Sequence, residues 1–247
     1  MRYFTINLYL FFVFLFFPVQ VYAACTNFFV NGQPPITPMT TRQSCFQYYA
    51  LGASDETLGN IWSAEHLTMD QIKAANTIPR KGKFDRFETQ FRSYKNSGYD
   101  RGHMAPSGNM PSFSSQEETF RFDNIVPQTK ILNSGKWNWI EHKIRRLTLQ
   151  YKEVYVVTGP VFFDIPKTIG IDHIWVPQAV WKAIYIPSIA MSGVYLCYNT
   201  NRPVCYIVSV SFFTDKTGID PFPGLPSEIK DIKMHLPKPR AKPSSVQ

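Results

Sequence analysis

Residues 99–106 read Tyr-Asp-Arg-Gly-His-Met-Ala-Pro, and this stretch carries the most information about the chain. Two further features follow in order: Asn-Ile-Val-Pro-Gln at 124–128, and Asn133 at the start of an amphipathic helical pattern. An imidazole is a base near neutral pH, guanidinium groups pair with phosphate, and an amide oxygen can hold a hard cation. A four-residue match alone would be weak, but the ordered set predicts phosphodiester cleavage with the help of a metal ion.

Taken together, these motifs resemble the DNA/RNA non-specific endonuclease family. The similarity runs from about Cys25 to Pro226 and includes Trp-Ser-Ala-Glu-His-Leu-Thr at 62–68 and Val-Thr-Gly-Pro at 157–160. The resemblance implies an α+β, ββα-metal (His-Me finger) nuclease fold, with a mainly antiparallel central sheet flanked by helices. It also implies that the motif histidine follows a strand and that a metal-binding asparagine lies on the facing helix.

The resemblance assigns roles to three residues of the motif region. His103 matches the general base, and Asn133 matches the sole protein ligand of a hydrated Mg²⁺, for which Mn²⁺ is a substitute. Glu141, further along the same helix, matches the acid that holds metal-bound water. Taken alone, Asn133 is more often a helix cap and Glu141 a solvated helix residue, so both roles depend on the resemblance. The remaining histidines lack such a setting and are expected to be surface or core residues: His66, His142, His173 and His235.

Two arginines and a second asparagine complete the site that the resemblance implies. Arg80 matches an upstream arginine that contacts the phosphate, and Arg101 lies in the motif itself. Asn124 matches an asparagine that supports the site. The chain departs from some members at Phe120, where they carry a further asparagine. A phenyl ring offers no oxygen, so any polar role at that position is absent here.

Composition and charge suit one globular domain with a polyanionic partner. The chain has 247 residues, 44% of them hydrophobic, which is enough for a sizeable core. The net charge of +8 and the pI near 9.3 fit nucleic acid, but they also fit an anionic envelope surface. We expect the nuclease domain over 24–236 and a disordered, basic and proline-rich tail over 237–247.

The N-terminal residues have the pattern of a secretory signal peptide. A short basic start precedes an unbroken apolar run, Leu8 to Phe17, which is too short for a comfortable membrane span. Cleavage after Ala23 would remove residues 1–23 and leave no stable membrane association. We therefore expect a secreted or periplasmic protein. An uncleaved anchor is the alternative, and lipidation at Cys25 is disfavoured by the residues before it.

Export would place the four cysteines in an oxidising compartment. An even number then favours two disulfides over free thiols, and three pairings are open. The local pairing, Cys25–Cys45 with Cys197–Cys205, is preferred because the second pair brackets a turn-rich stretch between two strand-like runs. Neither pair has the short spacing of a zinc site.

Two helices can be placed from local signals. Thr68 fits an N-cap, with Gln71 as its reciprocal partner, for a helix over 69–75. A second helix follows from Asn133, with Asn133 or Ser134 as its cap. Its apolar positions are Trp137, Ile140, Ile144 and Leu147.

Runs rich in Val, Ile, Tyr and Phe predict the strands. They cover 153–163 with a break at Gly159-Pro160, 179–186, 194–198 and 204–213. Gly218 fits the end of a short helix that begins near Ser211 or Thr214. Residues 26–40 and 92–116 have the composition of irregular chain, so the motif is expected in a loop.

These features predict an exported, Mg²⁺-dependent nuclease that contacts the phosphate backbone of DNA and RNA. Two alternatives remain open: a non-catalytic nucleic-acid-binding protein of the envelope, and an exported phosphodiesterase for small nucleotides. The sequence also leaves open the preference between DNA and RNA, a homodimer and an inhibitor protein.

Overall fold

The computed structural model describes residues 25–240, so the expected signal peptide and residues 241–247 of the expected tail lie outside the described residues. The strands are β1 Arg42–Cys45, β2 Ala50–Ser54, β3 Gly59–Thr68, β4 Tyr99–His103, β5 Ile125–Thr129, β6 Glu153–Val161, β7 Lys167–Ile169, β8 Ile174–Val176, β9 Ala179–Ile186, β10 Met191–Tyr198 and β11 Cys205–Val208. The α-helices are α1 Met69–Ala75, α2 Thr89–Ser93, α3 Phe113–Glu118, α4 Asn138–Tyr151, α5 Val210–Thr217 and α6 Ser227–Asp231. Within residues 25–240, no helix is long and apolar enough to cross a membrane.

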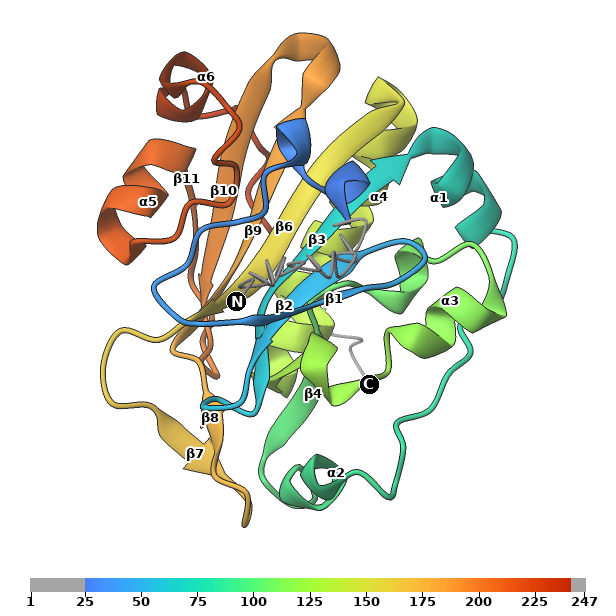
Figure 1. Ribbon diagram of the computed structural model, residues 1–247, viewed down its shortest axis with the longest axis vertical. Helices are drawn as coiled ribbons and strands as arrows, with labels where there is room; N and C mark the ends of the chain where they lie inside the picture. The colour runs from blue at the N-terminus through green and yellow to red at the C-terminus, as the bar shows by residue number, and fades with distance from the viewer. Residues whose placement is uncertain (1–24, 241–247) are drawn as a thin grey trace, which may run out of the picture.

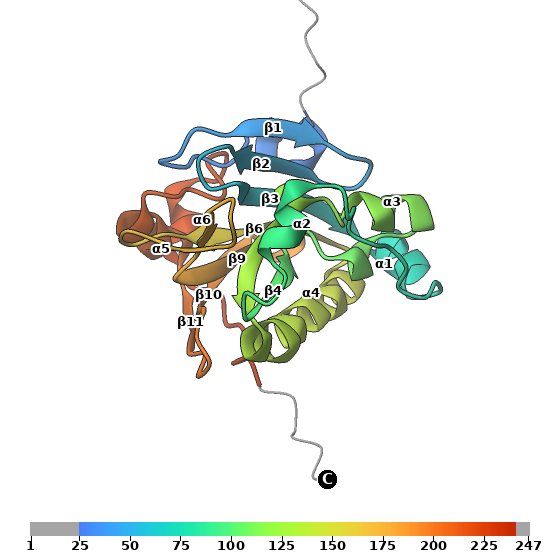
Figure 2. The same ribbon diagram turned by 90° about the horizontal axis from the view of Figure 1, so that it is seen from below.

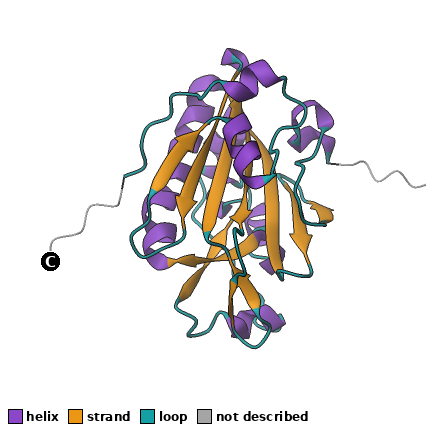
Figure 3. Ribbon diagram, turned by 90° about the vertical axis from the view of Figure 1, so that its left-hand side faces the viewer, coloured by secondary structure: helices purple, strands orange, loops and turns teal. Residues whose placement is uncertain are grey.

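A seven-stranded sheet in the order β1-β2-β3-β6-β9-β10-β11 forms the centre of the molecule (Figure 1). Its neighbouring strands are all antiparallel, which confirms the expected α+β class. Helix α4 lies on one face, and α5 and α6 lie on the other (Figures 2 and 3). Two smaller ladders, β4-β5 and β7-β8, complete the sheet structure.

Strand β9 shows why these strands read as continuous apolar runs. Alternate side chains of a strand point to opposite faces. Val180 and Ile184 therefore pack in the core beneath α4, whereas Trp181 packs against Phe213 of α5 with 5.0 Å between ring centroids. Because both faces are covered, apolar residues occupy both sets of positions. Lys182 is an exception, and it lies on the α4 face.

Several expected elements are confirmed. Helix α1 and strand β9 have the expected bounds, and β10 contains the expected strand over 194–198. The Thr68 side chain accepts a hydrogen bond from the Gln71 backbone N–H, as an N-cap does. The prediction that the Gln71 side chain bonds back to Thr68 is wrong, because the Gln71 side-chain amide donates to the Asn109 carbonyl at 2.9 Å instead.

Other boundaries differ for identifiable reasons. Strand β6 runs through Gly159-Pro160 without a break. A Cβ at Gly159 would lie 2.3 Å from the Ile61 carbonyl oxygen, so this glycine serves a close approach of strands and not a turn. The expected strand over 204–213 stops at Val208, because Ser209 caps α5 through the Phe212 N–H. Gly218 ends α5 with φ of 70°, as expected.

Both preferred disulfides are present. Cys25 is bonded to Cys45 and Cys197 to Cys205, which leaves none of the four cysteines free. Cys197 and Cys205 are direct partners in the register of β10 and β11, so the strand pairing itself brings the two sulfurs together.

We expect each disulfide to stabilise the fold by roughly 2–4 kcal/mol, with the larger loss from the pair that closes the longer loop. The sequence separations are 20 residues for Cys25–Cys45 and 8 for Cys197–Cys205. Urea unfolding of the two double-serine variants measures this difference. An equal midpoint for both variants and the parent protein would contradict the expectation, as would four alkylatable thiols in the unreduced protein.

Candidate active site

The candidate site is built on a ββα unit made of β4, β5 and α4. The motif residues 99–103 form strand β4, so the expectation that they lie in a loop is wrong. Their side chains are only partly apolar, but β5 pairs with β4 along its whole length, from Tyr99 opposite Thr129 to His103 opposite Ile125. His103 is the last residue of β4, as the family resemblance implied. The irregular composition after it corresponds to a short 3₁₀ turn and α3.

Gly102 is required by its neighbour on β5. A Cβ at Gly102 would lie 2.4 Å from the amide carbon of Gln128, which is fully buried. The glycine therefore allows the Gln128 side chain to pass over the strand next to His103. Substituting Gly102 would displace either Gln128 or the strand that carries the base.

Asn133 lies inside a π-helical turn, Leu132–Trp137, and does not cap the helix. The backbone at Gly135 leaves the helical region, with φ of −102° and ψ of −107°, before α4 begins. Such turns are frequent at functional sites. The Asn133 Nδ2 donates to Asp100 Oδ2 at 2.9 Å, so Asp100 joins strand β4 to the turn that carries Asn133. This bond leaves the Asn133 amide oxygen as the atom that can accept a ligand.

A cavity of about 430 Å³ brings the expected residues together. Five of the six residues singled out from the sequence line it, namely Arg80, Arg101, His103, Asn133 and Glu141. The sixth, Asn124, does not. The lining also includes residues that the sequence analysis did not single out: Pro106, Ser107, Gly108, Ser134, Asn138, His142 and Arg145. Most of these side chains are polar or charged, which suits an ionic ligand.

His103 has the properties of a neutral base. Its ring is 8% exposed, and its Nε2 has no hydrogen-bond partner among the described residues. The pKa of His103 is lowered to about 3, chiefly by burial and also by the charge of Arg80, while a hydrogen bond with the Arg101 backbone opposes both effects. The imidazole is therefore unprotonated at neutral pH, and its free Nε2 can accept a proton.

Asn124 stabilises the segment that follows His103. Its Oδ1 accepts from the Ala105 N–H and from Ser63 Oγ, each at 2.9 Å. Its Nδ2 donates to the carbonyls of Ala105 and Thr119. Because Oδ1 and Nδ2 are both used in these bonds, the fully buried Asn124 amide stabilises the backbone next to the site.

The two arginines lie in different surroundings. The Arg101 guanidinium is surrounded by aromatic rings, 4.5 Å from the centroid of Phe91 and 5.4 Å from that of Tyr94, and it donates to the Phe91 carbonyl. These contacts hold the cation at the cavity wall. Arg80 makes a single such contact, 5.5 Å from the Phe120 ring, so most of its donors remain available for a phosphate.

A buried group of charges behind the cavity was not expected from the sequence. Glu65 of β3 is fully buried, and burial raises its pKa to about 7, against the opposing charge of Lys182. Lys182 is 1% exposed and donates to Thr158 Oγ1 at 2.5 Å and to the Met104 carbonyl at 3.3 Å. Burial also raises the pKa of Glu141, and the charges of Lys182, Arg145 and Arg80 oppose it.

Asn109 links this charged group to the cavity. It donates to Glu65 Oε1 at 2.9 Å and accepts from Arg145 Nη1 at 3.0 Å. The usable signal in the sequence was a single charged residue inside each of two apolar strands, Glu65 in β3 and Lys182 in β9. His142 is exposed, as a surface histidine would be, and it also lines the cavity.

The residues present fit a hydrated hard cation. Within residues 25–240, no three His, Cys, Asp or Glu side chains gather as a metal cluster. A cation here would therefore depend on the Asn133 amide oxygen and on its own hydration shell. Asp100 fixes that oxygen by holding the amide nitrogen, and Glu141 lies on the same cavity wall. Mg²⁺ keeps several waters and needs few protein oxygens, so this donor set is sufficient.

We expect Asp100→Ala to reduce nuclease activity by about 10- to 100-fold, because the Asn133 amide would then rotate freely. The loss should lessen at high Mg²⁺ concentration. Asp100→Asn is the matched control, because its carbonyl oxygen can still accept the Asn133 N–H, and its loss should be smaller. Activity measured against Mg²⁺ concentration checks this. Wild-type metal dependence in Asp100→Ala would contradict the role of Asp100.

The sequence was compared with known protein families and with known proteins. A model of the family described as DNA/RNA non-specific endonuclease matches residues 33–228. Human mitochondrial endonuclease G is 31% identical over 182 residues, which are 63% of this chain and 57% of that protein. Human mitochondrial nuclease EXOG is 35% identical over 168 residues, which are 60% of this chain and 45% of that protein. The chain thus spans about half the length of these relatives.

A solved structure agrees with the sequence relatives. A chain of the crystal structure of the EndoG/EndoGI complex superposes with a TM-score of 0.70 and 27% sequence identity, covering 78% of this chain and 90% of that one. The match supports the ββα-metal nuclease fold that the motifs implied. The family model covers well over half of the sequence, including every residue of the candidate site. The chain therefore belongs to the DNA/RNA non-specific endonuclease family.

Proposed function

We propose that this protein is a metal-dependent endonuclease that hydrolyses internal phosphodiester bonds of DNA and RNA with little sequence preference. The observation that carries the proposal is the buried His103, which lines the same cavity as Arg80 and Asn133 and whose Nε2 has no hydrogen-bond partner among the described residues. Family membership supports the reaction class. The net charge of +8 favours a polyanionic substrate.

Each group of the site has a task in this reaction. His103 Nε2 accepts the proton of the attacking water, since the imidazole is neutral at working pH. Arg80, Arg101 and Arg145 line the cavity as cations for the phosphoryl oxygens. Asn133 would hold Mg²⁺, with Mn²⁺ as a substitute, and Glu141 would order its hydration shell. The bound cation would supply Lewis-acid stabilisation of the phosphate and the leaving oxygen.

The proposed nuclease is also an exported protein. The sequence of residues 1–23 has the pattern of a signal peptide, and both cysteine pairs are oxidised in the structure. Disulfides persist in oxidising compartments. A secreted or periplasmic nuclease is consistent with these features, and a homodimer or an inhibitor protein would be a further partner.

A substrate panel tests the proposal against its two rivals. Purified protein in Mg²⁺ should cut duplex DNA, single-stranded DNA and RNA, and EDTA should stop all three reactions. Binding without cleavage would identify a non-catalytic nucleic-acid-binding protein. Cleavage of dinucleotides and cyclic nucleotides in preference to polymers would identify a small-nucleotide phosphodiesterase.

A further inference from the structure

Phe120 touches both the proposed base and the proposed phosphate-binding cation. Its ring lies edge-on to His103, with 4.8 Å between centroids and an interplanar angle of 82°. The Arg80 guanidinium lies over the same ring at 5.5 Å. Phe120 is 8% exposed, so both contacts are made at the inner wall of the site.

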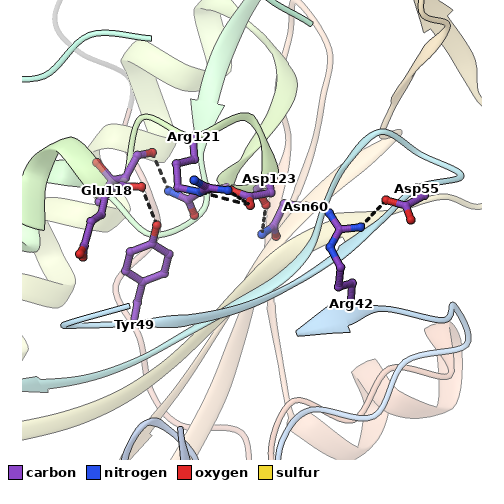
Figure 4. A network of polar contacts seen from close by, with 9 residues as sticks. Arg42, Tyr49, Asp55, Asn60, Glu118, Arg121 and Asp123 are labelled. Carbon is purple, nitrogen blue, oxygen red and sulfur yellow. Dashed lines mark hydrogen bonds and ion pairs between the residues drawn. The ribbon is translucent and has the colours of Figure 1, made fainter. Parts of the chain in front are cut away.

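The backbone on both sides of Phe120 is anchored. The Thr119 carbonyl accepts from Asn124, and Arg121 forms an ion pair with Asp123 at 2.9 Å. Figure 4 shows how this segment is attached to the sheet: the Tyr49 hydroxyl donates to the Glu118 carbonyl at 2.8 Å, and Asn60 donates to the Asp123 carbonyl at 3.0 Å. The ring therefore has little freedom to move away from His103.

The segment that carries Arg80, residues 80–84, packs closely against the Phe120 ring. Gly82 has φ of +146°, and a Cβ there would lie 2.2 Å from Phe120 Cε2. The Lys81 N–H donates to the Gln116 side chain at 2.6 Å, which holds the segment against α3. Phe84 lies beside Phe120, 5.6 Å from the His103 ring and 5.1 Å from the Phe120 ring. Phe84 and Phe120 thus pack against each other and against the same imidazole.

We infer that Phe120 is a positioning residue, whose ring fixes the His103 imidazole and the Arg80 guanidinium in one arrangement that faces a single phosphodiester. This inference rests on the proposed function. It gives Phe120 a role in the site, whereas the sequence alone indicated only that a phenyl ring at this position cannot act as a polar group. An edge-on ring packs against a neutral imidazole, and its face attracts the guanidinium. One side chain can therefore orient both groups.

The contact with Phe120 also contributes to the burial that lowers the pKa of His103. The charged and titratable residues that line the cavity with His103 are Arg80 and Arg101, together with Glu141, His142 and Arg145 of α4, and the charge of Arg80 lowers the pKa of His103. Hydrolysis needs a neutral imidazole, so activity is lost as the pH falls through the pKa of His103. A polar group in place of the ring would stabilise the imidazolium, raise this pKa and move the acid limit of activity to higher pH.

The test compares Phe120→Leu, Phe120→Asn and Gly82→Ala with Phe213→Leu as the matched control. Phe213 is also a buried phenylalanine, but it packs on Trp181 on the other face of the sheet. We expect kcat/KM on plasmid DNA to fall roughly 10- to 100-fold in the three site variants. We expect less than about a fivefold change in Kd for a DNA duplex in EDTA. Phe213→Leu should lower stability alone.

The decisive readout is the NMR titration of the labelled His103 imidazole in EDTA without DNA. Its midpoint should rise by at least about one pH unit in Phe120→Asn, whereas Phe213→Leu should match the wild type. Wild-type titration and chemical shifts in every Phe120 variant would overturn the inference. Failure of the wild type to cut any nucleic acid would instead refute the proposed function, and the titration would still decide the role of Phe120.

Discussion

His103→Ala should lose hydrolysis by on the order of 10²–10⁴-fold while keeping its fold and its affinity for DNA. The reason is that His103 lines the cavity with a neutral imidazole, whose Nε2 has no hydrogen-bond partner among the described residues. The cavity cations remain in the variant, so binding should persist. Initial rates of plasmid cleavage and duplex binding in EDTA, measured on the same preparation, check both parts.

Chemical rescue separates a lost base from a damaged site. His103→Gly should leave a space for free imidazole, and added imidazole should restore part of the rate. The same addition should do nothing for Asn133→Ala, which keeps its base. Turnover of His103→Ala within a few-fold of the wild type would remove His103 from the mechanism.

Asn133→Ala should abolish most Mg²⁺-dependent cleavage, because its amide oxygen is the atom that Asp100 presents to the cavity. Asn133→Asp should also be poor, since an added carboxylate would neutralise part of the charge needed at the phosphate. Glu141→Gln should be milder, at about 10- to 100-fold, as is common for groups that act through a hydration shell. Activity measured against Mg²⁺ concentration distinguishes these variants.

Arg80→Ala is the control for this series. It should weaken phosphate binding and lower the rate without changing the Mg²⁺ concentration needed for half-maximal activity. If Asn133→Ala kept wild-type metal dependence while Glu141→Gln lost it, the roles of Asn133 and Glu141 would be reversed. If Arg80→Ala alone changed the metal dependence, the cation would lie nearer to Arg80 than we propose.

Helix ends that depend on a single capping residue could be predicted from the local sequence. Thr68 caps α1 through one hydrogen bond, and Gly218 ends α5 because its φ is positive. The boundary after Val208 was missed because Val210, Phe212 and Phe213 are apolar and fit a strand and a buried helix equally well. Only the cap at Ser209 decides between them.

Five of the six residues singled out from the sequence line one cavity, but the geometry of that cavity was not predictable from the sequence. The motif named His103 and Asn133, but its polar composition concealed a strand that exists because β5 pairs with it. Asn133 was expected to cap a helix, whereas it lies inside a π-helical turn, donates to Asp100 and lines the cavity. Glu65 and Lys182 influence each other's pKa only because distant strands bring them into one buried region, which local patterns do not contain.

Closed circular substrates test the central claim most directly, because every cut in them is internal. Supercoiled plasmid DNA and circular single-stranded RNA should be incubated with the wild type and with His103→Ala, each in Mg²⁺ and in EDTA. The account predicts that both circles are opened by the wild type in Mg²⁺ and stay closed in EDTA, with His103→Ala slower by at least about 100-fold. Opening of the circles at the wild-type rate in EDTA or by His103→Ala would contradict it.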